Sequence, residues 1–106
     1  MSTIWLNGRL LSGDEPAITA DDHGLLVGDG VFETAKVVDG TPFALTRHLA
    51  RLRRSAAGLG LSLALTDAEL AAGVRDVIAA NEPGVGRLRM TVTGGPGPLG
   101  SARGAD

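Results

Sequence analysis

The stretch 31-VFETAKVVDGTPFAL-45 carries the strongest folding signal in the chain. Residues 31–38 are rich in β-branched side chains, which favour an extended strand. Asp39-Gly40 suits the two central positions of a tight hairpin turn, so residues 41–45 are expected to return as the partner strand. The stretch therefore predicts an antiparallel strand pair.

Alternation along the first of these strands divides its side chains between two faces. Phe32, Thr34 and Lys36 are expected on one face, whereas Glu33 and its alternate neighbours are expected on the other. Lys36 is the only lysine of the chain. One face thus combines an aromatic ring, a hydroxyl group and an amine.

Helices and further strands are predicted on either side of this hairpin. A helix is expected from Thr46, because leucine and alanine recur at helical spacing up to Leu59. A second helix is expected from Thr66, where Glu69 completes a capping box. A short hairpin around Asn7-Gly8 and an alternating strand over residues 87–93 complete the pattern. These elements predict an α+β fold in which two helices pack on one face of a small antiparallel sheet.

Length and composition limit the possible classes of protein. The 106 residues fit a single domain, which we expect over residues 1–93, followed by the connector 94-GGPGPLGSARGAD-106. A net charge of −2 and three aromatic residues do not favour a nucleic-acid partner. There is no cysteine, and no apolar segment of membrane-spanning length, so a cytoplasmic protein without disulfides or membrane contact is expected.

Two cationic side chains could carry chemistry, and each has a plain structural alternative. Arg51 lies at the edge of the apolar stripe of its helix, where it could bind an anion or lie along the surface. Lys36 could act as a nucleophile, bind an anion or be an exposed strand lysine. From position alone, the surface role is favoured for Arg51, and anion binding or simple exposure is favoured over a nucleophilic role for Lys36.

The polar residues of the loop at residues 21–30, and His48 in the helix expected from Thr46, are expected to have mainly structural roles. The group Asp21, Asp22 and His23 is expected to be solvated, and no metal site is expected. Gly28-Asp29-Gly30 is expected to be a turn that lets the backbone pass close to another surface. His48 is expected to bond a backbone carbonyl or to cap a loop, and catalysis is the less favoured alternative.

Two motifs at a fixed separation resemble the class IV (fold type IV) pyridoxal-phosphate aminotransferases and lyases. They are G-D-G-x-F-E-T at residues 28–34 and H-x-x-R-L-x-x-S-A at residues 48–56. The resemblance extends from about Ile4 to the end of the chain. It implies that the chain is the amino-terminal domain of such an enzyme and that the cofactor is pyridoxal 5'-phosphate.

The resemblance also implies roles for particular residues. Arg51 would bind the cofactor phosphate, and Phe32, Thr34 and Lys36 would face cofactor and substrate in the same crevice. Glu33 belongs to the same motif, but alternation places it on the other face of the strand, so it is expected to be structural. The Schiff-base lysine would belong to a second domain outside these 106 residues, so no catalytic residue is expected in this chain. Family members are typically homodimers.

Within the family, the segment is most similar to sequences assigned as aminodeoxychorismate lyase. That branch converts 4-amino-4-deoxychorismate to 4-aminobenzoate and pyruvate in folate biosynthesis. D-amino acid aminotransferases carry an arginine and a histidine where this connector has 98-PLGS-101, and branched-chain aminotransferases usually have F-E-G at residues 32–34. Both aminotransferase activities remain alternatives, as does a non-catalytic stand-alone binding domain.

Overall fold

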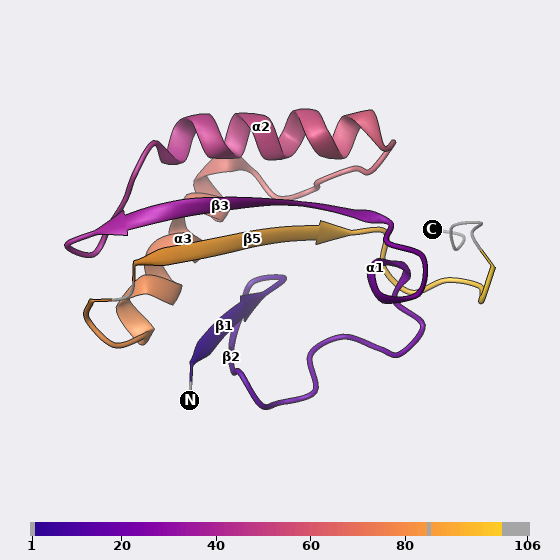
Figure 1. Ribbon diagram of the computed structural model, residues 1–106, viewed down its shortest axis with the longest axis horizontal. Helices are drawn as coiled ribbons and strands as arrows, with labels where there is room; N and C mark the ends of the chain where they lie inside the picture. The colour runs from indigo at the N-terminus through magenta and orange to yellow at the C-terminus, as the bar shows by residue number, and fades with distance from the viewer. Residues whose placement is uncertain (1, 85, 101–106) are drawn as a thin grey trace.

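An antiparallel sheet with strand order β4-β3-β5 forms the central layer of the computed structural model, which describes residues 2–84 and 86–100 (Figure 1). Its strands are β3 (Gly30–Val38), β4 (Thr41–Pro42) and β5 (Arg87–Thr93). A separate hairpin pairs β1 (Thr3–Leu6) with β2 (Arg9–Ser12). The helices are α1 (His23–Leu26), α2 (Leu45–Gly58) and α3 (Asp67–Ala80).

Both predicted hairpin turns are confirmed. Asn7 and Gly8 have φ angles of 49° and 97°, and Asp39 and Gly40 have 49° and 76°, which is the left-handed pair of conformations that a type I′ turn requires. The expected return strand over residues 41–45 is too long, because pairing ends at Pro42. Ala44, with φ 54°, then turns the chain into α2.

The two helices lie on the same face of the sheet, as the sequence predicts. β3 and β5 pair from Gly30↔Thr93 to Lys36↔Arg87. The core cluster joins Val37 of β3, Leu88 of β5 and Val74 of α3, while Leu49, Leu52 and Ala56 are the buried residues of α2. The fold is therefore α+β with a small antiparallel sheet covered by helices on one side. Across residues 2–84 and 86–100, no helix is long and apolar enough to cross a membrane.

The amino-terminal hairpin is attached to α3. The capping box of Thr66 and Glu69 starts this helix, as predicted. Gly73 is buried on the face where the helix meets the Trp5 indole, and an ideal Cβ at Gly73 would lie 2.7 Å from that ring. At the end of α3, the Asn81 side chain accepts a hydrogen bond from Thr3 N at 2.8 Å and donates one to Thr3 O at 2.9 Å.

The segment around α1 binds the start of the connector. His23 is fully buried, its backbone N–H donates to Gly95 O at 2.9 Å, and its Nε2 lies 2.6 Å from Pro98 O. Asp22 is also buried, and it forms an isolated bridge with Pro96. The expectation that Asp22 and His23 are solvated is therefore wrong, because these two residues hold the connector against the domain. Residues 101–106 of the connector lie outside the described residues.

Candidate functional site

In the described part of the chain, one face of the β3–β5 pair carries no helix and presents six polar or aromatic side chains. We call this set the open face. Residues directly opposite in an antiparallel pair project to the same side, and the register places three cross-strand pairs there. The pairs are Phe32↔Thr91, Thr34↔Arg89 and Lys36↔Arg87, and all six residues are exposed.

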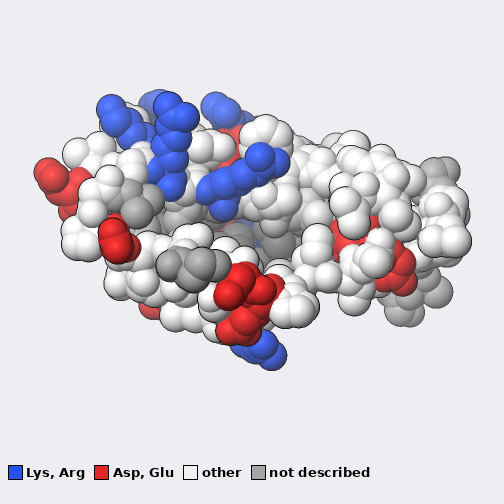
Figure 2. Space-filling view, turned by 60° about the horizontal axis from the view of Figure 1, so that its bottom comes forward, with Lys and Arg blue, Asp and Glu red and all other residues white. Residues whose placement is uncertain are grey.

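The open face is strongly basic. Lys36 and Arg87 are directly opposite each other, and Arg89 is two residues further along β5. Within residues 2–84 and 86–100, none of these three cations forms an ion pair with an acidic side chain. Like charges placed opposite each other in a sheet destabilise it, so a bound anion would relieve a repulsion that the fold maintains. In the space-filling view, basic side chains gather on one side of the molecule beside a hollow (Figure 2).

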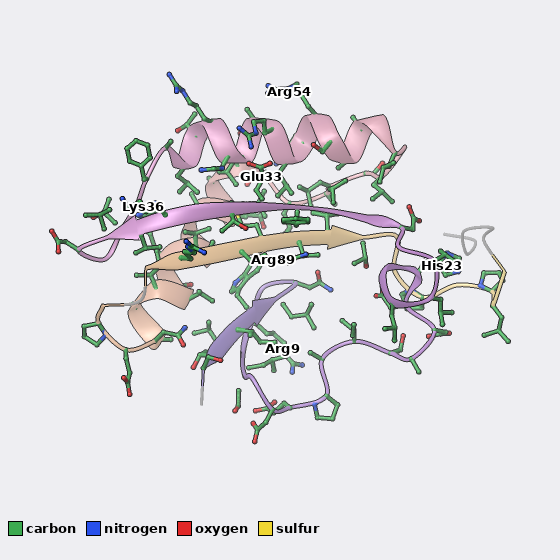
Figure 3. All side chains as sticks on the ribbon, in the orientation of Figure 1. Arg9, His23, Glu33, Lys36, Arg54 and Arg89 are labelled. Carbon is green, nitrogen blue, oxygen red and sulfur yellow. The ribbon has the colours of Figure 1, made fainter. Side chains whose placement is uncertain are left out.

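Phe32 and Arg89 are organised against each other on this face. The Arg89 guanidinium carbon lies 3.9 Å from the centroid of the Phe32 ring, within the range of a cation–π contact. Arg89 Nε also donates a hydrogen bond to Thr91 Oγ1 at 3.3 Å. These two contacts limit the rotamers of Arg89 and hold its charge over the face (Figure 3).

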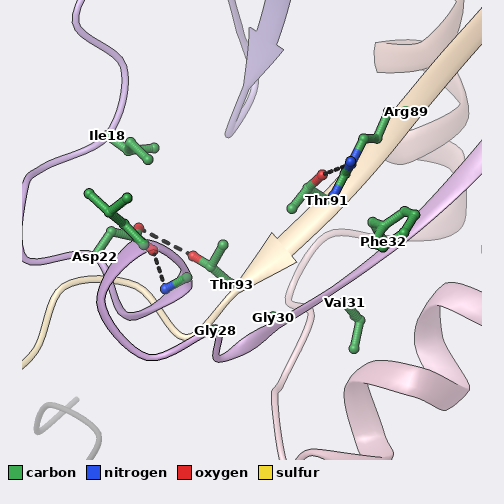
Figure 4. A pocket seen from close by; sticks show the side chains of 11 residues that line it. Ile18, Asp22, Gly28, Gly30, Val31, Phe32, Arg89, Thr91 and Thr93 are labelled. Carbon is green, nitrogen blue, oxygen red and sulfur yellow. Dashed lines mark hydrogen bonds between the residues drawn. The ribbon is translucent and has the colours of Figure 1, made fainter. Parts of the chain in front are cut away.

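A pocket of about 400 Å³ opens where β3 begins and β5 ends (Figure 4). Phe32, Arg89 and Thr91 belong to its lining, so the pocket is continuous with the open face. The remaining lining comes from the α1 segment and the neighbouring strand ends, namely Ile18, Asp22, Gly24, Leu25, Gly28, Gly30, Val31 and Thr93.

Asp22 joins two parts of the pocket lining. Its carboxylate accepts hydrogen bonds from Gly24 N at 2.8 Å and from Thr93 Oγ1 at 3.2 Å. Position 30 of the pocket lining requires glycine, because an ideal Cβ there would lie 2.9 Å from Val92 O. The prediction that the G-D-G segment lets two backbones pass closely is thereby confirmed.

Arg51 lies on the helix side of β3, next to a buried carboxylate. Glu33 is 8% exposed, and its Oε1 is 2.7 Å from His48 Nδ1 and 3.4 Å from Arg51 Nε. The carboxylate can only accept, so His48 Nδ1 carries the proton of this hydrogen bond. That bond, reinforced by the positive charge of Arg51, holds the pKa of Glu33 below its ordinary value although burial opposes the shift.

The structure brings together three of the four predicted site residues. Phe32, Thr34 and Lys36 share the open face, as alternation predicts, and Glu33 faces the other way. Arg51 does not join them: it is on the Glu33 side of the same strand, with its side chain 62% exposed. The four residues therefore do not share one face of β3, and a crevice that includes all of them stays a prediction.

Two further findings concern residues whose contacts the sequence did not reveal. His48 bonds a carboxylate of β3 and not a backbone carbonyl, because α2 crosses directly over Glu33 (Figure 3). Arg87 and Arg89 join the open face through pairing with residues more than fifty positions away. The alternation over residues 87–93 fixes the side of its own strand on which Arg89 lies, but only the register shows which strand is its neighbour.

Comparison with known proteins identifies the family. The family model described as amino-transferase class IV matches residues 30–106. This range holds both β3 and β5, the helix with Arg51 and the connector. The chain belongs to the class IV aminotransferase family. Pyridoxal 5'-phosphate is the cofactor of this family, since similar structures were solved in a PLP-bound form and with N-(5'-phosphopyridoxyl)-L-glutamate.

Individual relatives come from different branches of that family. The chain is 37% identical over 95 residues to a D-alanine aminotransferase of Bacillus licheniformis, a match that covers 90% of this chain and 34% of the relative. A 4-amino-4-deoxychorismate lyase structure from Pseudomonas aeruginosa has 37% identity and a TM-score of 0.73 over 95% of this chain and 34% of that one.

A third similar protein is a branched-chain aminotransferase from the archaeon Thermoproteus uzoniensis, solved with norvaline. It has 30% identity and a TM-score of 0.75, covering 87% of this chain and 33% of that one. The chain thus spans about one third of the length of each of these relatives.

Proposed function

We propose that this domain is the amino-terminal third of a pyridoxal-phosphate enzyme that converts 4-amino-4-deoxychorismate to 4-aminobenzoate and pyruvate. The observation that carries the proposal is the cross-strand pair of Lys36 and Arg87, with Arg89 beside it, on a face without compensating acidic side chains in residues 2–84 and 86–100. Such a face suits a substrate with more than one carboxylate.

Arg51 is the residue of this domain that fits the cofactor phosphate. Its side chain is largely exposed, and among the described residues its ion-pair partner is Glu33, whose Oε1 lies 3.4 Å from Arg51 Nε. The two terminal amino groups therefore remain available for the bidentate contact that arginine makes with phosphate oxygens. Bound pyridoxal phosphate would withdraw electrons from the carbon that carries the substrate amino group, which lyases and aminotransferases both require.

The remaining residues would bind and orient the substrate. Because Arg51 lies on the helix side of β3, cofactor and substrate would have to meet at the edge of β3 that pairs with no described strand between Gly30 and Lys36. 4-Amino-4-deoxychorismate has a carboxylate on its ring and another on its enolpyruvyl group. Lys36, Arg87 and Arg89 offer charges for both, and the Phe32 ring offers an apolar surface for the substrate ring. Thr34 lies between Phe32 and Lys36 along the strand, where its hydroxyl can bond a substrate oxygen. The proton-transferring lysine would come from the region that the relatives have beyond this domain.

The elimination balances without a further reactant. A proton is lost from the carbon that bears the amino group, the bond from the neighbouring carbon to the ether oxygen breaks, and the ring becomes aromatic. The enolpyruvate that leaves takes up a proton and becomes pyruvate. Water and an oxidant are not consumed, so the two products should appear in equal amounts.

The test is product formation by the full-length protein that contains this domain. Purified protein is incubated with 4-amino-4-deoxychorismate, 4-aminobenzoate is measured by fluorescence after chromatography, and pyruvate is measured by a coupled dehydrogenase. We expect both products in equal amounts. Absence of 4-aminobenzoate, together with amino transfer from an amino acid to 2-oxoglutarate, would refute the lyase.

Transamination is the second candidate function. It is supported by the identity of 37% to a D-alanine aminotransferase and by the branched-chain enzyme among the similar structures. D-Alanine and leucine each carry one carboxylate, so they would leave part of the basic face without a partner. Assays with D-alanine or leucine as amino donor therefore separate the two candidates. We also propose a homodimer, which light scattering of the same preparation tests.

A stand-alone binding domain is the third possibility. It predicts a coding sequence without a lysine-bearing second domain and a protein that does not absorb as a pyridoxal enzyme. Sequencing downstream of residue 106 distinguishes it from both enzymes.

A further inference from the structure

Glu33 is a carboxylate in a position that otherwise takes apolar residues. It lies on the same face of β3 as Ala35 and Val37, both of which are buried under the helices. A buried carboxylate is costly unless it is paired. Glu33 is paired twice, with His48 and with Arg51, and both partners belong to α2.

The pairing has a particular consequence for Arg51. The ion pair is made at the inner nitrogen of the guanidinium, since Arg51 Nε lies 3.4 Å from Glu33 Oε1. Within residues 2–84 and 86–100, no other acidic side chain lies within ion-pair distance of Arg51. An exposed arginine normally samples many rotamers. Fixing Nε restricts that sampling while it leaves the two terminal amino groups free.

His48 in turn fixes Glu33. Its Nδ1 is 2.7 Å from the same Oε1 atom, and its side chain is only 18% exposed. His48 and Arg51 are three residues apart, on one side of α2. The three side chains therefore form an ordered chain of contacts, from His48 to Glu33 and from Glu33 to Arg51.

We propose that Glu33 is a positioning residue, seated by His48, that orients the guanidinium of Arg51 toward the phosphate of the cofactor. The proposal rests on the proposed function, because it takes Arg51 as the phosphate ligand. It assigns Glu33 a role in phosphate binding, where alternation along the strand suggested only a structural one. What matters is the location of the accepting oxygen, since the negative charge itself would weaken the attraction between Arg51 and a phosphate.

Two variants separate the location of the oxygen from its charge. Glu33→Gln keeps an oxygen at the same distance from the backbone and removes the charge. Glu33→Asp keeps the charge and withdraws the oxygen by one methylene. Each is prepared in the full-length protein, stripped of cofactor, and titrated with pyridoxal 5'-phosphate and with pyridoxal, which lacks the phosphate. Absorbance gives a Kd for each compound.

Positioning predicts a specific pattern. Glu33→Asp raises the Kd for pyridoxal 5'-phosphate by about three- to tenfold, the cost of immobilising one long side chain on binding. Its Kd for pyridoxal is unchanged. Glu33→Gln binds pyridoxal like the wild-type protein and pyridoxal 5'-phosphate at least as tightly, because the charge that opposes the phosphate is gone. In an Arg51→Gln background, Glu33→Asp has no further effect on the binding of either compound.

Other outcomes overturn the inference, and they are distinguishable from failure of the proposed function. If Arg51→Gln leaves the preference for the phosphorylated compound intact, Arg51 is not the phosphate ligand and the proposed function loses its cofactor contact. A second outcome is that Arg51→Gln abolishes the preference for the phosphorylated compound while Glu33→Asp leaves both Kd values unchanged or raises both by the same factor. In that case Glu33 does not position Arg51. Loss of binding in Glu33→Gln would assign the effect to charge and would also refute positioning.

Discussion

At the scale of single residues, Glu33 links stability to pH. Its carboxylate accepts the hydrogen bond from His48 and lies beside the charge of Arg51, and together these contacts lower its pKa in the folded protein. A group whose pKa is lower in the folded state than in the unfolded state stabilises the fold when it is ionised. That contribution is complete above the unfolded pKa and is lost as the pH falls through the folded one.

We therefore predict that acid destabilises the wild-type protein more than the Glu33→Gln variant. The difference should begin as the pH falls below about 4.5, the ordinary pKa of this group. Urea unfolding at a series of pH values measures it, and the other carboxylates, common to both proteins, cancel in the comparison. Parallel stability curves for the two proteins would show that the pairing does not contribute to stability.

Lys36 provides the second prediction at this scale. Lys36→Met keeps the length of the side chain and removes the charge, so KM for 4-amino-4-deoxychorismate should rise by about tenfold, the typical loss for one charge-assisted hydrogen bond. Arg54→Met is the matched control, because Arg54 is an exposed cation on the outer side of α2 (Figure 3). Steady-state kinetics of both variants tests this role of Lys36. A KM of Lys36→Met equal to that of the wild-type protein and of Arg54→Met would contradict it.

At the scale of elements, the contact of α3 with the amino-terminal hairpin depends on a residue without a side chain. Gly73 faces Trp5 so closely that an ideal Cβ would lie 2.7 Å and 2.9 Å from two atoms of the indole. A ring packed between a hairpin and a helix cannot retreat as the end of a flexible side chain can. Shape, and not helix propensity, decides the residue here.

Gly73→Ala should accordingly lower the free energy of unfolding by about 1–3 kcal/mol, the usual cost of overpacking. Gly58→Ala is the control, since that helical glycine has nothing within 4 Å of its ideal Cβ, and alanine there should be neutral or stabilising by about 0.5–1 kcal/mol. Urea unfolding followed by circular dichroism and by the fluorescence of Trp5, the only tryptophan, measures both. A Gly73→Ala protein as stable as Gly58→Ala would contradict the close contact.

At the scale of the whole molecule, His23 determines the path of the chain after β5. Its Nε2 must carry a proton, because Pro98 O can only accept the hydrogen bond of 2.6 Å. Its backbone N–H donates a hydrogen bond to Gly95 O at 2.9 Å, and nearby Asp21 O accepts one from Gly97 N at 3.2 Å. The connector therefore leaves the domain along a fixed course beside the pocket.

Removing the imidazole donor should loosen the attachment of the connector to the domain. In His23→Leu, we predict that the amide of Gly97 exchanges with solvent at least about tenfold faster, while the amides that pair β3 with β5 keep their protection. His23→Gln can still donate a hydrogen bond to Pro98 O and should retain more of the protection. Hydrogen exchange measured by NMR or mass spectrometry compares the three proteins. Unchanged exchange at Gly97 in His23→Leu would refute the role of the imidazole.

Local signals in the sequence determined much of this fold. The left-handed turns at Asn7-Gly8 and Asp39-Gly40, the capping box at Thr66 and the alternation along β3 depend on neighbouring residues, whose conformations are limited by their own covalent structure. The same signals placed Phe32, Thr34 and Lys36 on one face. The paired motifs, in addition, indicated the family.

Only the tertiary structure decided which distant residues meet. It set Arg87 opposite Lys36, buried His23 against Pro98, and put Arg51 with Glu33 on the other side of β3 from the open face. Strand register and helix docking are selected by the joint packing of residues that are far apart in the chain, and no short segment contains that information. The sequence by itself thus determined the elements and their faces, whereas packing determined which charges share a site.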